Sequence, residues 1–172
     1  MWTFTDLEGE YTLILGEVHT GKTQLTQKLL KEAETLKKEI AVIDMAPQFE
    51  NERKVGGKLC PGKNTVYYTT TIETPRLSGE TLNEVFALAE LNKEKIEKIF
   101  DIYVPKEVLF MNDVSIYLQR GNFKTLVNII SSAQTCIMNG YYGTSLGKDR
   151  LSQEERSQMV KLQKYCHNII RR

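Results

Sequence analysis

Eight consecutive residues of this chain match a pattern that cradles phosphate groups. Residues 16–23 fit G-x-x-x-x-G-K-[ST], in which the glycines let the backbone turn tightly and approach an anion. The N–H groups of such a loop, with the positive end of the helix that follows, attract the phosphates of a nucleotide. We therefore expect a nucleotide-phosphate site, called the P-loop below, formed by Gly16, Glu17, Val18, His19, Thr20, Gly21, Lys22 and Thr23.

Two side chains of the P-loop bring chemistry of their own. Lys22 can reach the β- and γ-phosphate oxygens as a point charge, which gives it a catalytic as well as a binding role. The hydroxyl of Thr23 is of the type that binds Mg²⁺ in this pattern. His19 occupies a variable position, where we expect a solvent-facing side chain and keep contact with the ligand as the alternative.

Carboxylate and amide side chains follow two other apolar segments. Residues 108–111 form an apolar run that is followed by Asn112-Asp113, and Asp44 ends an earlier run. Ligands of open α/β sheets lie outside the carboxyl ends of the strands, so these residues should face the nucleotide. Asp44 has an alternative role, which is to cap the turn that follows it. The predicted Mg²⁺ ligands are therefore Thr23, Asn112, Asp113 and Asp44.

The Asn112-Asp113 pair has one carboxylate where such sites usually have two. A P-loop enzyme needs an acid at the end of a second strand to organise Mg²⁺ and water. If Asn112 takes the metal-organising place, Asp113 is the catalytic acid. If Asp113 takes the metal-organising place, no acid follows it, because the next residues are Val114 and Ser115. The pair predicts slow hydrolysis with Asp113 orienting the water, or a nucleotide used for another purpose.

Several further polar residues are candidates for ligand contact. Asn139 follows the apolar run 135–138 and could sense the γ-phosphate or cap the next loop. Tyr141 or Tyr142 could stack on a base or be partly buried. An arginine could supply charge to the transition state, but the sequence does not rank the candidates Arg76, Arg120 and Arg150.

These residues need a sheet and its helices to position them. The β-branched and apolar runs at 11–15, 39–44, 66–72, 108–111 and 135–138 predict strands. Apolar residues at helical spacing predict helices over 22–37, after residue 78, over about 122–132 and after residue 152. Continuously apolar strands indicate a sheet that is covered on both faces.

Local signals refine the ends of these elements. Residues 2–5 alternate and predict an edge strand, Ser78 is the expected cap of the helix that follows it, and Asn92 is expected to break that helix. Ser152 and Glu155 have the spacing of a capping box that opens the last helix. We expect the end of the chain, 171–172, to be frayed.

The segment 48–79 has a weak pattern and several glycines and prolines. Loops commonly carry specificity, so we expect this segment to lie near the nucleotide and the acceptor of any transfer reaction to sit over residues 51–74. The alternative is a solvated, charged loop.

The composition narrows the class of protein. The 172 residues predict a single nucleotide-binding domain over 1–172, and the formal net charge of +1 shows no broad bias toward nucleic acid. Three widely separated cysteines favour reduced thiols. There is neither an apolar run of membrane-spanning length nor a signal-peptide pattern, so we expect no membrane partner and a cytoplasmic location.

The order of these features resembles that of RecA-like P-loop nucleoside triphosphatases. The P-loop, Asp44, Asn112-Asp113 and Asn139 follow one another as in that group, and small archaeal and bacterial nucleoside-triphosphatases are similar in length. Residues 108–121 also resemble the P-loop type of cob(I)alamin adenosyltransferase, which has an Asp-Glu pair and a glycine beyond it. The resemblance implies an α/β, three-layer P-loop NTPase fold, with a five-stranded, mostly parallel sheet and helices on both faces.

The leading expectation is a protein that binds ATP, or possibly GTP, and hydrolyses it slowly with Mg²⁺. No Asn/Thr-Lys-x-Asp run of the guanine-reading type is present, which favours ATP. One alternative is a nucleotide-dependent transferase, a kinase or adenosyltransferase, with a small acceptor. The other is a non-catalytic, nucleotide-gated switch that binds a protein partner. The sequence leaves the oligomeric state open.

Overall fold

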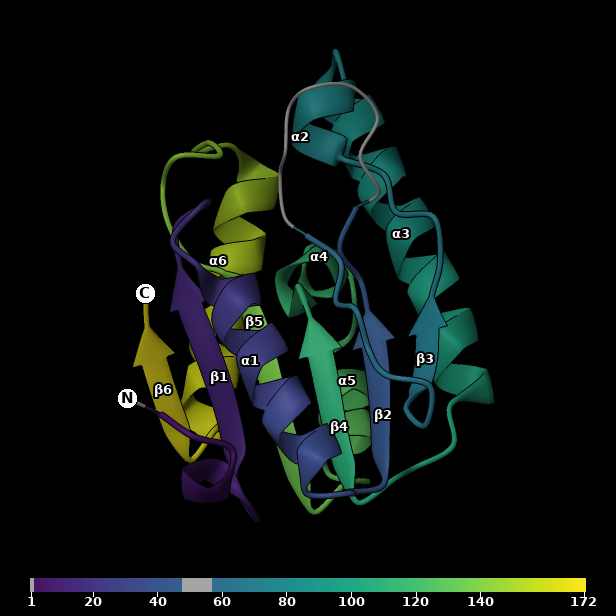
Figure 1. Ribbon diagram of the computed structural model, residues 1–172. Coiled ribbons are helices and arrows are strands. Elements are labelled where there is room, and N and C mark those ends of the chain that lie inside the picture. Colours follow the sequence, from purple (N-terminus) through teal and green to yellow (C-terminus); the bar gives the residue numbers. More distant parts are fainter. Residues whose placement is uncertain (1, 48–56) are drawn as a thin grey trace.

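A single parallel sheet of six strands organises the molecule, which is described by a computed structural model over residues 2–47 and 57–172. The strands lie in the order β3-β2-β4-β5-β1-β6, and every neighbouring pair is parallel (Figure 1). Their bounds are β1 Tyr11–Gly16, β2 Ile40–Asp44, β3 Val66–Thr69, β4 Val108–Asn112, β5 Thr135–Tyr141 and β6 Asn168–Arg171. The predicted specificity segment 48–79 lies in part, over 48–56, outside the described residues.

Helices cover both faces of this sheet, as the apolar strands predict. Neighbouring residues of β1 point to opposite sides: Ile14 belongs to a core cluster with the apolar face of α1, and Leu13 to a cluster with α3, α4, α5 and α6. The predicted three-layer α/β fold is therefore confirmed. The helices are α1 Lys22–Thr35, α2 Pro75–Ser78, α3 Leu82–Ile102, α4 Val114–Leu118, α5 Phe123–Ile130 and α6 Arg150–Tyr165, with a short 3₁₀ turn at Thr5–Leu7.

The carboxyl ends of all strands meet at one edge of the sheet, drawn at the top of Figure 1. In the strand register, Gly16 pairs with Tyr141 and Asp44 pairs with Asn112. Residues that are far apart in the sequence, from the P-loop to the start of the loop after β5, are therefore neighbours at this edge.

The end of the chain differs from the prediction. The segment expected to fray forms the sixth strand, β6, which pairs with β1, and the N–H of Arg172 donates to Leu15 O at 2.8 Å. The expected number of five strands was therefore wrong. The sixth strand lies at the edge of the sheet, and an edge strand with few apolar residues has a weak sequence pattern. The edge strand predicted for 2–5 is also wrong: Phe4 is fully buried at a 3₁₀ turn, and β6 occupies that side of β1.

Three helix signals were wrong, because the polar side chains concerned have other hydrogen-bond partners than the sequence pattern indicates. Asn92 does not break α3, since its buried amide accepts from Glu73 N at 2.8 Å and donates to Glu73 O at 3.0 Å. Ser78 ends α2, and Thr81 caps α3. Asp149, rather than Ser152, caps α6 by accepting from Ser152 N at 2.8 Å.

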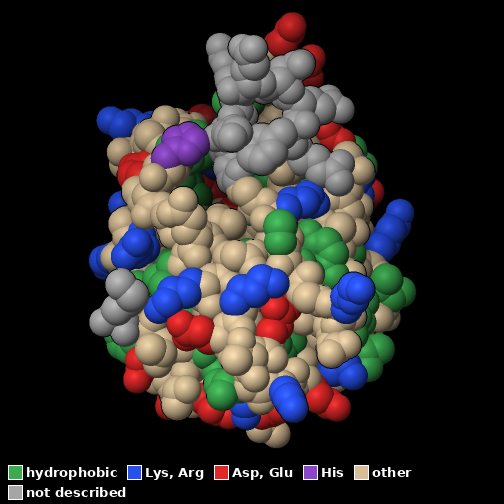
Figure 2. All heavy atoms as spheres, in the orientation of Figure 1, with side chains coloured by type: hydrophobic (Ala, Val, Ile, Leu, Met, Phe, Trp, Pro, Cys, Tyr) green, Lys and Arg blue, Asp and Glu red, His purple; other side chains and the backbone are tan. Residues whose placement is uncertain are grey.

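Within the part of the chain that the structure describes, no helix has the length and apolar character that crossing a bilayer requires. On the face seen in Figure 2, acidic and basic side chains are interspersed, and the basic ones form no continuous band. This mixed face agrees with the small net charge.

Candidate functional site

A cleft of about 760 Å³ opens at the carboxyl edge of the sheet. Its walls come from the P-loop and the start of α1, from 74–77 at α2, and from 113–119 at α4. The loop after β2 and the end of β5 complete it. This volume lies within the range of pockets that hold small-molecule ligands. The P-loop therefore faces a real cavity, whose lining includes Lys22, Thr23, Arg76, Asp113, Ser115, Gln119, Asn139 and Tyr141.

The two fixed glycines of the P-loop are required by its geometry. Gly21 has φ +84°, a left-handed conformation that non-glycine residues rarely adopt, and it directly precedes α1. A Cβ at Gly16 would lie 2.3 Å from the carbonyl oxygen of Arg172. His19 is exposed, as predicted, and it also lines the cleft.

The ammonium of Lys22 folds back onto its own loop. It donates to the carbonyl oxygen of Glu17, which also accepts from Thr20 Oγ1 at 2.9 Å. Burial lowers the pKa of Lys22, while the charges of Asp113 and Glu17 oppose that shift. A phosphate in the loop would offer this cation a charged partner in place of a neutral carbonyl.

The side chain of Glu17 ties the P-loop to the segment after β5. Its carboxylate accepts from Thr144 N at 2.6 Å and from the hydroxyl of Ser145. These hydrogen bonds lower the pKa of Glu17. A Cβ at Gly143 would lie 2.1 Å from the Glu17 carboxyl carbon, so only glycine fits there without a shift. No pattern in the sequence predicts this contact, because the two segments are far apart in the chain and only the sheet brings them together.

Asp113 shares the cleft with Lys22. Its backbone is left-handed, with φ +61°, a strained conformation for a residue other than glycine. Two contacts hold it: Asp113 N donates to Asn139 Oδ1 at 2.9 Å, and Ser115 Oγ donates to Asp113 Oδ1 at 2.9 Å. Burial raises the pKa of Asp113, and the Ser115 hydrogen bond and the Lys22 charge oppose the rise. A carboxylate with a raised pKa is a better proton acceptor.

The other two acidic or amide candidates lie beneath the cleft in a buried network. Asp44 Oδ1 accepts from Ala46 N at 3.0 Å and from Asn112 Nδ2 at 2.9 Å. Asp44 Oδ2 accepts from Leu59 N at 2.7 Å and from Tyr67 OH at 3.1 Å. The turn-capping alternative accounts for the first of these bonds, and the metal role of Asp44 stays a prediction.

Asn139 joins this network to the P-loop helix. Its amide nitrogen donates to Asn112 Oδ1 at 2.8 Å and to Thr26 Oγ1 at 2.9 Å. The Thr26 hydroxyl in turn donates to Lys22 O at 2.9 Å. Through one side chain, β4, β5 and α1 hold the positions of Asp113 and Lys22. The sequence signal for it was a polar residue directly after the run 135–138, and the structure places this residue inside β5.

The structure places only one of the three candidate arginines, Arg76, at the cleft among the described residues. Arg120 pairs with Glu90 at 3.1 Å and with Glu154 at 3.2 Å, and Arg150 is an exposed partner of Glu154 at 3.1 Å. Arg76 lines the cleft instead, with its guanidinium carbon 5.5 Å from the centre of the Tyr141 ring. Tyr141 is only 8% exposed, which matches the buried alternative for this residue.

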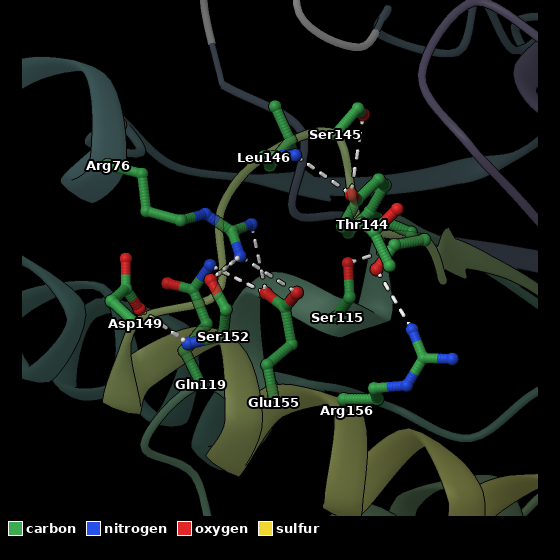
Figure 3. Close-up of polar contacts among 12 residues, drawn as sticks. Arg76, Ser115, Gln119, Thr144, Ser145, Leu146, Asp149, Ser152, Glu155 and Arg156 are labelled. Atoms are coloured by element: carbon green, nitrogen blue, oxygen red, sulfur yellow. Dashed lines mark hydrogen bonds and ion pairs between the residues drawn. The ribbon is translucent and has the colours of Figure 1, made fainter.

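Arg76 is held by a group of residues that sequence reasoning missed (Figure 3). Its two terminal nitrogens donate to the two oxygens of Glu155 at 3.1 and 3.2 Å, and Gln119 Nε2 donates to Glu155 Oε2 at 2.8 Å. One signal for Glu155 was available. It occupies a position of the apolar stripe of α6, whose other members are Leu151, Met159 and Leu162.

The described residues contain no group of three or more histidine, cysteine, aspartate or glutamate side chains suited to hold a metal ion. A Mg²⁺ ion at a P-loop usually keeps several waters and takes few ligands from the protein. Of the four predicted ligands, Thr23 and Asp113 line the cleft, whereas Asn112 and Asp44 are buried below it. The side-chain oxygens of Thr23 and Asp113 therefore fit such an ion best.

Comparison with known proteins gives the fold and little more. No family model matches the chain, and no curated protein matches its sequence. The flagellar accessory protein FlaH from Methanocaldococcus jannaschii is similar in structure, with a TM-score of 0.53 and 13% identity over 95% of this chain and 71% of that one. A Pyrococcus horikoshii OT3 protein, PH0250, has a TM-score of 0.44 and 12% identity over 98% and 85%. The first likeness supports the α/β fold with a parallel sheet.

Proposed function

We propose that this chain binds a nucleoside triphosphate, ATP or possibly GTP, at the P-loop and hydrolyses it slowly with Mg²⁺. One observation carries the proposal: Lys22 and Thr23 of the P-loop line the same cleft at the carboxyl edge of the sheet as Asp113, which was predicted from a distant part of the sequence. The α/β fold is compatible with the proposal but does not carry it, because sites on a shared fold can differ in chemistry.

Each residue has a part in this proposal. The P-loop N–H groups and the start of α1 bind the phosphates, and Lys22 exchanges the Glu17 carbonyl for their oxygens. Thr23 and Asp113 are the residues that would hold Mg²⁺, which when bound neutralises charge on the phosphates. Asp113 is also the candidate to orient a water for attack.

Slow turnover follows from the local chemistry. Asp113 is the acid that faces Lys22, and Asn112 beside it is an amide, whose oxygen already accepts from Asn139. Stabilisation of the developing charge, rather than general base chemistry, is usually the larger contribution to phosphoryl transfer. A site with a single carboxylate can therefore retain hydrolysis at a low rate.

Phosphate release from ATP and from GTP, each with Mg²⁺, tests the hydrolysis proposal. The variants are Lys22→Ala and Asp113→Ala, with Lys28→Ala as a matched control, because Lys28 lies on the same helix and makes only exposed contacts with Trp2 and Glu32. We expect turnover to be lost with Lys22→Ala and Asp113→Ala and kept with Lys28→Ala. Equal turnover in all four proteins would rule the site out.

A nucleotide-gated switch is the second candidate, and the Glu17 contacts favour it. The carbonyl of Glu17 holds Lys22 and Thr20, while its carboxylate holds 144–145. A phosphate that draws Lys22 away therefore acts on the residue that anchors this loop. Hydrogen exchange of the Thr144 amide should change when MgATP is added. A transferase would instead show nucleotide consumption that depends on an added acceptor.

A further inference from the structure

The guanidinium of Arg76 is placed where a second cation could meet a bound phosphate. Arg76 belongs to α2, at the wall of the cleft, and its side chain is 9% exposed. Lys22, Arg76 and Asp113 line this same cleft, and the charges of the two cations oppose the rise in the pKa of Asp113 that burial causes. Asp113 therefore lies within the field of one cation from the P-loop and another from α2.

Arg76 and Glu155 form a buried ion pair. The two donor distances of 3.1 and 3.2 Å describe a bidentate pair, and the same guanidinium donates to Ser152 Oγ at 3.1 Å. A guanidinium binds a phosphate with the same fork of donors. Glu155 thus occupies the position that a phosphate oxygen pair would take on Arg76.

The surroundings of Glu155 would partly compensate for the loss of Arg76. Gln119 Nε2 also donates to Glu155, at 2.8 Å, so one hydrogen bond would remain after Arg76 leaves. Burial raises the pKa of Glu155, which eases its protonation once the cation has gone. The amide oxygen of Gln119 is buried and has no hydrogen-bond partner among the described residues, so it can accept a hydrogen bond from a neutral, protonated Glu155 or from a ligand.

We propose that Arg76 exchanges Glu155 for the terminal phosphate of the bound nucleoside triphosphate and stabilises the charge that develops there. The inference rests on the proposed function and adds to it a second phosphate-binding residue with a protein carboxylate as its resting partner. Arg120 and Arg150 are outside this role, since their partners lie on the surface at Glu90 and Glu154.

Two measurements on Arg76→Ala test the proposal. Loss of a preorganised donor to developing charge typically costs on the order of 10²–10³-fold in kcat, and we expect a loss of this size. The variant should also lose most of its preference for a non-hydrolysable ATP analogue over ADP, because Arg76 would contact the terminal phosphate alone. Arg120→Ala is the matched control and should change neither quantity.

Two further variants separate this role from a structural one. Arg76→Ala leaves Glu155 buried without its cation, so the double variant Arg76→Gln/Glu155→Gln, which replaces the ion pair by amides, is measured beside it. Arg76→Ala and the double variant should both lose the preference for the ATP analogue over ADP. Glu155→Gln alone frees the guanidinium and should bind the ATP analogue more tightly than the wild type does.

The outcomes distinguish the two levels of the proposal. If Lys22→Ala abolishes binding while the Arg76 variants keep wild-type kcat and wild-type preference for the triphosphate, Arg76 is a structural partner of Glu155 and the inference is overturned. If Lys22→Ala binds nucleotide as the wild type does, the proposed function fails, and the inference fails with it.

Discussion

Replacing Asn139 by alanine should destabilise the protein more than any exposed polar substitution of similar size. The amide makes three hydrogen bonds: to Asn112 Oδ1 at 2.8 Å, to Thr26 Oγ1 at 2.9 Å, and from Asp113 N at 2.9 Å. Asn139 is 2% exposed, so truncating its side chain leaves the groups that it contacts in the interior without their hydrogen-bond partner.

The expected magnitude follows from this count. A typical intramolecular hydrogen bond contributes about 1 kcal/mol net, so three of them give a loss of about 3 kcal/mol in the free energy of unfolding. An effect below about 1 kcal/mol would match an ordinary surface substitution and would contradict this count.

Urea denaturation measures this difference directly from the midpoint and slope of the transition. Asn128→Ala is the matched control, because Asn128 is exposed on α5. We expect the Asn139→Ala midpoint to fall well below that of Asn128→Ala, with an unchanged slope. Equal midpoints for the two variants would refute the claim that the Asn139 network holds Asp113 and the P-loop helix together.

Three other predictions concern the cleft. Phosphate release by the wild type should rise with pH as Asp113 loses its proton, at a pKa above the usual 3.8; a rate that does not change with pH in this range would contradict the role of Asp113. The raised pKa also means that Asp113 contributes stability below its unfolded pKa and loses that contribution as pH rises through the folded value, so Asp113→Asn should unfold at higher urea than the wild type at pH 7. Cys60 is exposed and lines the cleft, whereas Cys136 is buried with a raised pKa, so alkylation should modify Cys60 first and MgATP should slow it; an unchanged rate with saturating MgATP would place the nucleotide elsewhere.

The sequence predicted the parts of the fold that depend on local pattern. The P-loop, the apolar runs of β1, β2, β4 and β5 and the helix of α1 were found because strand, glycine loop and helix succeed one another directly. Parallel pairing then brings Asp113 to the same edge as Lys22, which topology alone ensures.

The sequence did not predict contacts that depend on packing between distant segments. β6 is short and forms only by pairing with β1. Asn92 was predicted to break a helix, but its amide hydrogen-bonds the backbone of Glu73 and the helix continues through it. Glu155 resembled a capping residue because its partner Arg76 is far away in the sequence. In each case the prediction used only the neighbours of a residue along the chain. The contacts that stabilise the residue come from segments that are distant in sequence and close in the fold.

A calorimetric titration of the wild type and Lys22→Ala with MgATP, with Lys28→Ala as the control, tests the central claim most directly. We predict binding by the wild type and Lys28→Ala at one site per chain and no measurable binding by Lys22→Ala, with all three proteins equally stable to urea. Equal affinity of Lys22→Ala and the wild type would contradict the assignment of the P-loop as the nucleotide site.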